Sequence, residues 1–99
     1  MARFDAHEFR HGDGLLLDVQ ADLLDHLNTR VVVPLLAKAH APVPAARLNP
    51  EFVLQGEVYV MATQFLAAVP IGELGARVGG LQDSFAEITA ALDMVFQGF

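Results

Sequence analysis

The chain has 99 residues, which is the size of one domain. Hydrophobic residues make up 54% and charged residues 18%, so few polar side chains are available to cover the surface. We therefore expect some apolar surface to meet a partner, and a homodimer is the simplest arrangement. The net charge of −6, with six scattered Lys and Arg residues, argues against direct binding to nucleic acid. Cysteine is absent, the sequence opens MARFDAHEF without an apolar signal segment, and no run reaches the roughly 18 apolar residues of a membrane helix. We expect a soluble, cytoplasmic protein that does not enter a membrane.

The first third of the chain predicts a β-hairpin and an interrupted strand. Residues 2–10 and 15–19 read as strands joined by the turn HGDG. Residues 20–28 form either a helical turn or an irregular loop that exposes Leu23 and Leu24. Residues 30–37 start β-branched, and Pro34 should place that strand at a sheet edge or bend it.

The middle of the chain predicts a long connection and a second hairpin. Residues 38–50 contain three prolines, and residues 51–55 and 57–63 flank Gly56 as paired strands. Residues 64–69 extend that hairpin or leave it, ending at Pro70. Residues 71–81 contain four glycines, so we expect at most one short turn there, at about 73–78.

The end of the chain predicts an amphipathic helix at about 83–97. Ser84 and Glu87 have the spacing of a capping box. Apolar residues at spacings of three and four form one stripe: Phe85, Ile88, Leu92, Val95, Phe96 and Phe99. The other side carries Ala86, Ala90, Asp93 and Gln97. We expect Phe96 to pack in the core, whereas core and interface remain equal alternatives for Phe99 and for Leu23–Leu24.

Short strands, two hairpins and one terminal helix together predict a mostly β fold with a C-terminal α-helix. We expect a single domain over residues 1–99, with a small antiparallel barrel at about 1–81 and the helix appended to it.

The sequence contains one literal catalytic motif, H-E-x-x-H at His7 to His11. A zinc site needs both imidazoles within about 2 Å of one metal, but residues four apart on a strand lie about 13 Å apart. We therefore expect solvated strand histidines and no metal. Asp22 and Asp25 invite a carboxylate-site interpretation, shared with Asp18, but solvated charges beside Leu23–Leu24 explain them more simply.

Other catalytic signatures are absent from the sequence. It has no cysteine nucleophile and no G-x-S-x-G elbow, and its glycine-rich stretch GELGARVGG lacks a Walker lysine. We expect no catalytic residues, no enzyme activity and no cofactor.

Three stretches carry a family resemblance: LDVQADLLD at 17–25, RVVVPL at 30–35 and DMVFQGF at 93–99. They are similar to the CcdB toxins of type II toxin–antitoxin modules. The likeness extends to the overall length, the hairpin LNPEFVLQGEVYVMAT and the Ala68-Val69-Pro70 step before the glycine-rich stretch.

This resemblance implies a homodimer of SH3-like barrel subunits, each with a C-terminal helix. It implies a toxin that binds the DNA gyrase A subunit, traps the enzyme on cleaved DNA and catalyses nothing. A cognate antitoxin with a disordered C-terminal segment would neutralise it. By position, the family's gyrase contacts fall on Leu23, Leu24, Asp93, Phe96, Gln97, Gly98 and Phe99.

The chain departs from the family pattern at two of these positions. Gln97 stands where the family typically has tryptophan, and Asp93 replaces a neutral amide. Two other functions therefore remain open: a ribonuclease toxin of similar barrel shape, and an adaptor that only binds an antitoxin-like peptide.

Overall fold

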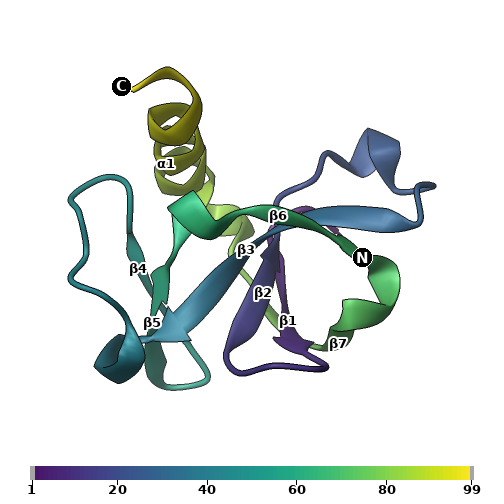
Figure 1. Cartoon of the computed structure of the whole chain (residues 1–99), viewed down its shortest axis with the longest axis horizontal. Helices are drawn as coiled ribbons and strands as arrows, with labels where there is room; N and C mark the ends of the chain where they lie inside the picture. The colour runs from purple at the N-terminus through teal and green to yellow at the C-terminus, as the bar shows by residue number, and fades with distance from the viewer. Residues whose placement is uncertain (1, 99) are drawn as a thin grey trace.

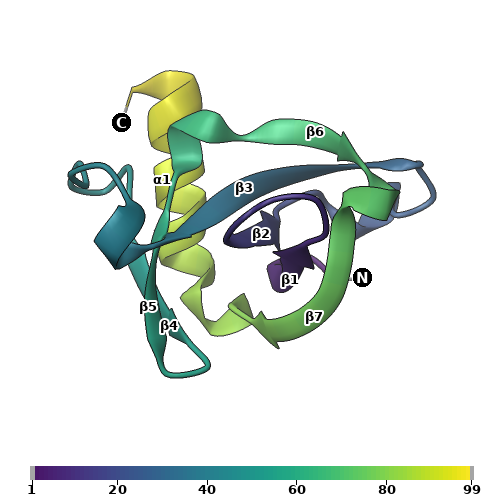
Figure 2. The same ribbon diagram turned by 60° about the horizontal axis from the view of Figure 1, so that its bottom comes forward.

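The computed structural model describes residues 2–98 and shows a curved antiparallel sheet with one helix packed on it (Figure 1). The strands follow the order β4-β5-β3-β2-β1-β7, and β6 also pairs with β3. In Figure 2 the strands curl into a half-barrel, which confirms the predicted mostly β fold with a C-terminal helix. The elements are β1 Asp5–Phe9, β2 Leu15–Asp18, β3 Thr29–Ala37, β4 Glu51–Leu54, β5 Glu57–Met61, β6 Ala67–Pro70, β7 Leu74–Gly80 and α1 Phe85–Gln97. Five single 3₁₀ turns join them: η1 Asp22–Leu24, η2 Lys38–His40, η3 Thr63–Phe65, η4 Ile71–Glu73 and η5 Gln82–Ser84.

Both predicted hairpins are present. β1 pairs with β2 across the 10–14 turn, and β4 pairs with β5 across Gln55 and Gly56. Gln55 and Gly56 both have positive φ, 52° and 77°, as a tight two-residue hairpin turn requires.

Of the two alternatives predicted for Pro34, an edge strand or a bend, the edge strand is wrong, because β3 lies inside the sheet. One side of β3 pairs with β2, and the other side pairs first with β6, over Thr29 to Val32, and then with β5, over Leu35 to Ala37. The Pro34 carbonyl accepts a hydrogen bond from the Ala62 amide, so the missing N–H faces the same side. That side is the gap between β6 and β5, where no strand partner needs a donor from residue 34.

The glycine-rich stretch is also different from its prediction, because it forms the strand β7 instead of one short turn. β7 pairs with β1 through two irregularities of register. A Cβ on Gly75 would lie only 3.1 Å from the Glu8 carbonyl oxygen. Here the missing side chain allows two strands to approach closely, so glycine supports the strand instead of ending it.

The helix α1 forms without the predicted capping box. The Ser84 side chain makes no capping hydrogen bond, and its backbone (φ −102°, ψ 25°) is not extended as an N-cap requires. The reason is that η5 runs directly into α1, and the Ser84 amide already donates to the Leu81 carbonyl at 2.9 Å. At the other end Gly98 has a φ of 80°, and its amide donates to the Met94 carbonyl.

The core lies between α1 and the inner face of the sheet. Ile88 and Ala91 are fully buried there, together with Leu17, Val33, Leu35 and Met61. The helical stripe is narrower than predicted, since Phe85 and Phe96 are exposed and the core assignment of Phe96 is wrong. At about 100° per residue these two positions lie about 60–80° around the helix from Ile88, on the rim of the buried stripe. Phe99 lies outside the described residues.

Among residues 2–98, no helix combines the length and the apolar character that crossing a membrane requires.

Candidate functional site

The turn η1 presents the two leucines that the sequence singled out. Leu23 is 87% exposed and Leu24 is 42% exposed, so the open choice between core and surface is resolved in favour of the surface. The Leu24 amide donates to Ala21 and the Asp25 amide to Asp22, which shapes the segment as a helical turn. Asp22 and Asp25 flank it in solvent, as expected.

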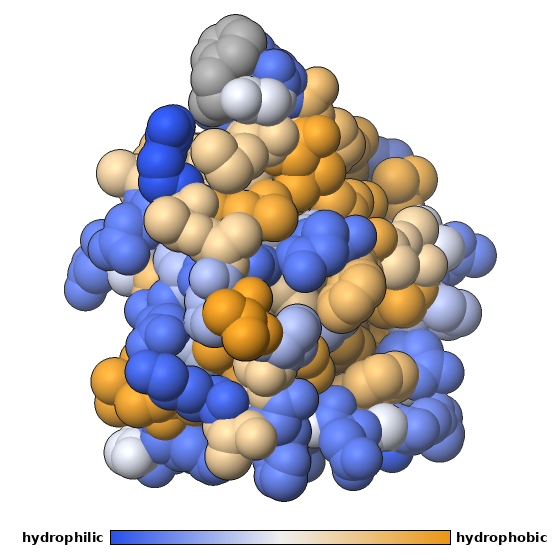
Figure 3. All heavy atoms as spheres, turned by 60° about the vertical axis from the view of Figure 1, so that its left-hand side comes forward, coloured by the Kyte–Doolittle hydropathy of each residue, from blue (hydrophilic) through white to orange (hydrophobic). Residues whose placement is uncertain are grey.

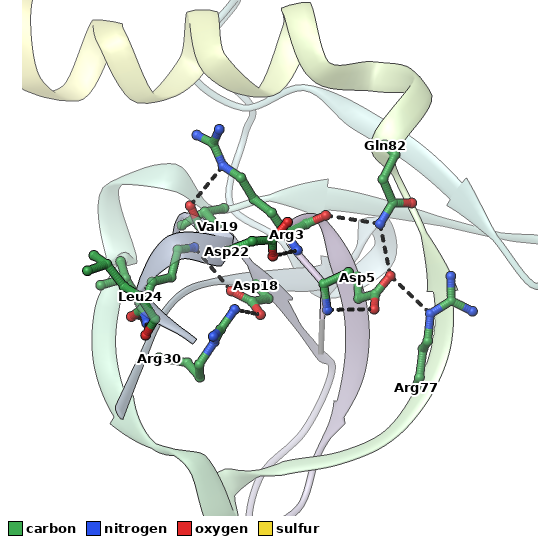
Figure 4. A network of polar contacts seen from close by, with 12 residues as sticks. Arg3, Asp5, Asp18, Val19, Asp22, Leu24, Arg30, Arg77 and Gln82 are labelled. Atoms are coloured by element: carbon green, nitrogen blue, oxygen red, sulfur yellow. Dashed lines mark hydrogen bonds and ion pairs between the residues drawn. The ribbon is translucent and has the colours of Figure 1, made fainter. Parts of the chain in front are cut away.

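A buried polar network lies under this turn (Figure 4). Asp18 and Arg30 form an ion pair that is closed to solvent. The main-chain amide of Gln20 donates to Asp18 Oδ1 at 3.1 Å. The side chain of Gln20 donates from Nε2 to the Leu24 carbonyl at 2.9 Å. This network was not predicted from the sequence. Asp18 ends one apolar strand and Arg30 lies near the start of the next, and charged residues in such strands could have indicated a buried pair.

A second set of contacts joins the turn to the segment that precedes α1. The Arg3 amide donates to Asp22 Oδ1 at 2.8 Å, and Gln82 Nε2 donates to the Arg3 carbonyl and to Asp5 Oδ1, both at 2.9 Å. Arg77 completes the set through an ion pair with Asp5. Burial acts most strongly on Asp5 and would raise its pKa, but hydrogen bonds from Gln82, Arg77 and the Ala2 amide outweigh it and lower the pKa below 3.8.

The C-terminal end of α1 offers the other candidate contact residues. Phe96 is 69% exposed, and Asp93, Gln97 and Gly98 are exposed beside it. Within residues 2–98, the Asp93 and Gln97 side chains enter no hydrogen bond or ion pair. Their polar atoms are therefore open to a partner.

The two candidate surfaces do not meet within one subunit. In Figure 1 the C-terminal end of α1 lies at the upper left and the η1 turn, between β2 and β3, lies at the upper right, apart from each other. One partner that touches both sets must therefore span the space between them or bind more than one subunit.

The H-E-x-x-H motif is not a metal centre in this fold. His7 lies buried in β1, where its Nδ1 donates to the Gly75 carbonyl at 3.1 Å, so its expected solvation was wrong. His11 lies in the following turn and faces Glu73 at 3.0 Å. Across the described part of the chain, no three His, Cys, Asp or Glu side chains are grouped to hold a metal ion.

Two shallow pockets lie away from η1. One of about 540 Å³ is lined by Asp13, Gly14, Leu36, Ala37 and His40, and one of about 320 Å³ by Arg47, Pro50, Glu87 and Ala90.

Figure 3 shows apolar surface gathered below the C-terminal end of α1 on the face that it draws, with hydrophilic side chains around the lower rim. Exposed apolar side chains of this kind favour a site for binding a macromolecule over a small-molecule cavity.

The half-barrel with one C-terminal helix is a fold that solved structures of other proteins share. It is similar to an endoribonuclease from a mycobacterial species, with 17% identity over 97% of this chain and 90% of that chain and a TM-score of 0.78. It is also similar to the Mycobacterium tuberculosis toxin MazF-mt6 (15% identity, 93% and 95% coverage, TM-score 0.78). A mycobacterial endoribonuclease in complex with its cognate antitoxin matches at 18% identity, 97% and 94% coverage and a TM-score of 0.77. At these identities the likeness shows the fold alone.

The sequence family is more specific than the fold. The family model described as "CcdB protein" matches residues 3–98, nearly the whole chain. The chain therefore belongs to the CcdB family of toxins.

Proposed function

We propose that this chain is the toxin of a type II toxin–antitoxin module that binds the DNA gyrase A subunit, traps the gyrase–DNA cleavage complex and catalyses no reaction. The observation that carries the proposal is the exposure of Leu23 and Phe96, at positions to which the sequence resemblance assigns gyrase contacts. Apolar side chains that are largely exposed in their own subunit are suited to anchor a protein interface. Leu24, Asp93, Gln97 and Gly98 are exposed around them, and Phe99 completes the set in the proposal.

The proposal includes a homodimer and an antitoxin. A dimer would bring the η1 turn and the helix end of two subunits onto one composite surface, which a single subunit lacks. The net charge of −6 favours a basic, disordered antitoxin segment as the neutralising partner. A solved structural neighbour is itself bound to its cognate antitoxin, which supports this part by analogy.

A ribonuclease toxin is the second candidate, because the structural neighbours include endoribonucleases. RNA cleavage needs accessible cations beside the scissile phosphate. Arg30 is buried against Asp18, whereas Arg77 and Lys38 are ion-paired but more than half exposed. The six basic residues are scattered along a chain with a net charge of −6, and this pattern favours the gyrase proposal over an RNA-binding cleft.

The test compares DNA and RNA damage after induction of the chain in bacteria. We expect growth arrest with gyrase-linked DNA breaks and intact cellular RNA, and purified gyrase should accumulate cleaved DNA when the protein is added. Leu23→Asp should abolish the effect. Val43→Asp is the matched control, because Val43 is 93% exposed but lies in the 38–50 connection. RNA cleavage without DNA breaks would transfer the proposal to the ribonuclease class, and no growth arrest would favour the adaptor.

Gln97→Trp tests whether the helix end uses the family mode. Tryptophan adds a planar surface that stacks on an arginine, worth about 1–2 kcal/mol when desolvated, so affinity for a gyrase A fragment should rise roughly tenfold. Gln97→Leu adds apolar area without an aromatic face and should gain less. Unchanged affinity of Gln97→Trp would contradict a gyrase contact at this position.

A further inference from the structure

We propose that Gln20 is a positioning residue, which holds the Leu23–Leu24 turn in the geometry that a partner recognises. The inference rests on the proposed function for its consequence, but the ordering of the turn is a property of this chain alone. Gln20 lies two residues after the end of β2 and is only 6% exposed, although glutamine is rarely buried without a partner.

Both polar atoms of the Gln20 side chain form hydrogen bonds. Its Oε1 accepts from the Val31 amide of β3 at 3.0 Å, and its Nε2 donates to the Leu24 carbonyl at 2.9 Å. These two bonds fix which way the side-chain amide points, since a flipped amide would set donor against donor and acceptor against acceptor. The side chain thus clamps the end of η1 to the central strand of the sheet.

The clamp is itself braced from below. The Gln20 main-chain amide donates to Asp18 Oδ1, while the other Asp18 oxygen is held by Arg30. All three side chains are buried, where a hydrogen bond is shielded from competing water. The Arg30–Asp18–Gln20 series therefore transmits the rigidity of β2 and β3 to Leu24.

The turn has little else to order it. η1 has only three residues, buries none of them and has no side-chain cap. Such a short 3₁₀ turn is marginal by itself. The main-chain hydrogen bonds of the turn are all local, including one from the Leu27 amide to the Leu24 carbonyl at 3.2 Å. A tie to another segment, from the Arg3 amide to Asp22, is exposed. Without the Gln20 clamp, the leucines would lose their fixed orientation. Ordering them on binding would then cost conformational entropy and lower the affinity for a partner.

Two variants separate the clamp from general stability. Gln20→Glu keeps the size and the acceptor for Val31, and in its ionised form it replaces the donor to Leu24 with an oxygen. Because a protonated carboxyl would keep a donor there, the variant is measured at a pH at which the introduced carboxyl is ionised, and Gln20→Met removes the donor at every pH. Asn49→Asp is the matched control, because Asn49 is 8% exposed and its Nδ2 donates to the Met61 carbonyl at 3.0 Å and to Gln64. Gln20→Met, a neutral side chain of similar length, repeats the test if the buried acid prevents folding.

The first measurement needs no partner. Backbone ¹⁵N order parameters at residues 22–25 should fall below about 0.6 in Gln20→Glu or Gln20→Met, from the rigid value of about 0.85, and should stay unchanged in Asn49→Asp. A turn that stays rigid in both Gln20 variants overturns the inference, whatever the partner is.

The second measurement is a double-mutant cycle on binding to a gyrase A fragment. Gln20→Glu should weaken binding about tenfold in the wild-type background and not at all when Leu23 and Leu24 are both alanine. Equal losses in the two backgrounds, or an equal loss from Asn49→Asp, would show a merely structural role and overturn the inference. If the wild-type chain does not bind the fragment, the proposed function fails, and the order parameters alone decide on Gln20.

Discussion

Asp18 and Arg30 show how much of the candidate site depends on charges that no solvent reaches. Removing one member of a buried ion pair leaves the other uncompensated, which costs about 3–5 kcal/mol. We expect Arg30→Met to lower the free energy of unfolding by about that amount in urea denaturation, and Asp18→Leu/Arg30→Met to recover much of the loss. Lys38→Met is the control, since its ion pair with Glu51 is exposed and worth at most about 1 kcal/mol. Similar losses from Arg30→Met and Lys38→Met would contradict a buried pair.

Asp5 gives the structure a defined acid sensitivity. Because its pKa in the folded protein lies below the ordinary 3.8, its ionised form stabilises the fold above about pH 4, and this contribution is lost as the pH falls through the lower, native pKa. Asp5→Asn should lower stability at neutral pH and should lose less of the remainder on acidification from about pH 5 to pH 2. Urea denaturation at a series of pH values measures this, and parallel curves for the two proteins would contradict the assignment.

At this scale the sequence predicted exposure only in part and did not predict pairing. The two aspartates that flank the exposed leucine pair are solvated as expected, but His7 is buried and Phe96 is exposed, contrary to expectation. The partnership of Asp18 with Arg30, and the clamp from Gln20, depend on which strand lies beside which, and spacing along the chain does not contain that information.

The hairpins allow a test of what their glycines contribute. Gly14 and Gly56 have nearly equal φ, 76° and 77°, but a Cβ on Gly14 would lie 2.7 Å from the Leu35 carbonyl oxygen, whereas a Cβ on Gly56 meets nothing within 4 Å. Gly56→Ala should cost only the left-handed backbone penalty, about 1–2 kcal/mol, and Gly14→Ala clearly more. Thermal or urea unfolding of the two variants measures the difference. Equal costs would mean that β3 shifts to accept the new methyl group.

Elements set by local patterns were predictable, and those set by neighbours were not. Both hairpins, the terminal helix and the long connection follow from turn residues and periodicity. Three features depend instead on neighbouring parts of the fold. The strand β7 forms because it pairs with β1, and Pro34 lies inside the sheet because it faces the gap between β6 and β5. The start of α1 is uncapped because η5 runs directly into it. Local propensity is overridden wherever such tertiary pairing decides the backbone.

For the whole molecule, the fold and the activity are separate questions. The same half-barrel occurs in mycobacterial endoribonucleases, so the architecture does not distinguish a nuclease from a gyrase poison. The proposed gyrase function rests instead on surface features, the exposed leucine turn and the exposed end of α1. Of the seven residues that family positions suggested, six are described and exposed, and Phe99 lies outside the described residues.

The most direct test of the central claim is a titration of a purified gyrase A fragment with the wild-type chain, Leu23→Ala, Phe96→Ala and Val43→Ala. Truncating a central apolar anchor typically costs about 2 kcal/mol or more in affinity, which is more than tenfold. We predict saturable binding by the wild type, at least tenfold weaker binding by Leu23→Ala and Phe96→Ala, and no change for Val43→Ala. Absence of binding by the folded wild-type chain, or equal binding by all four proteins, would contradict the account.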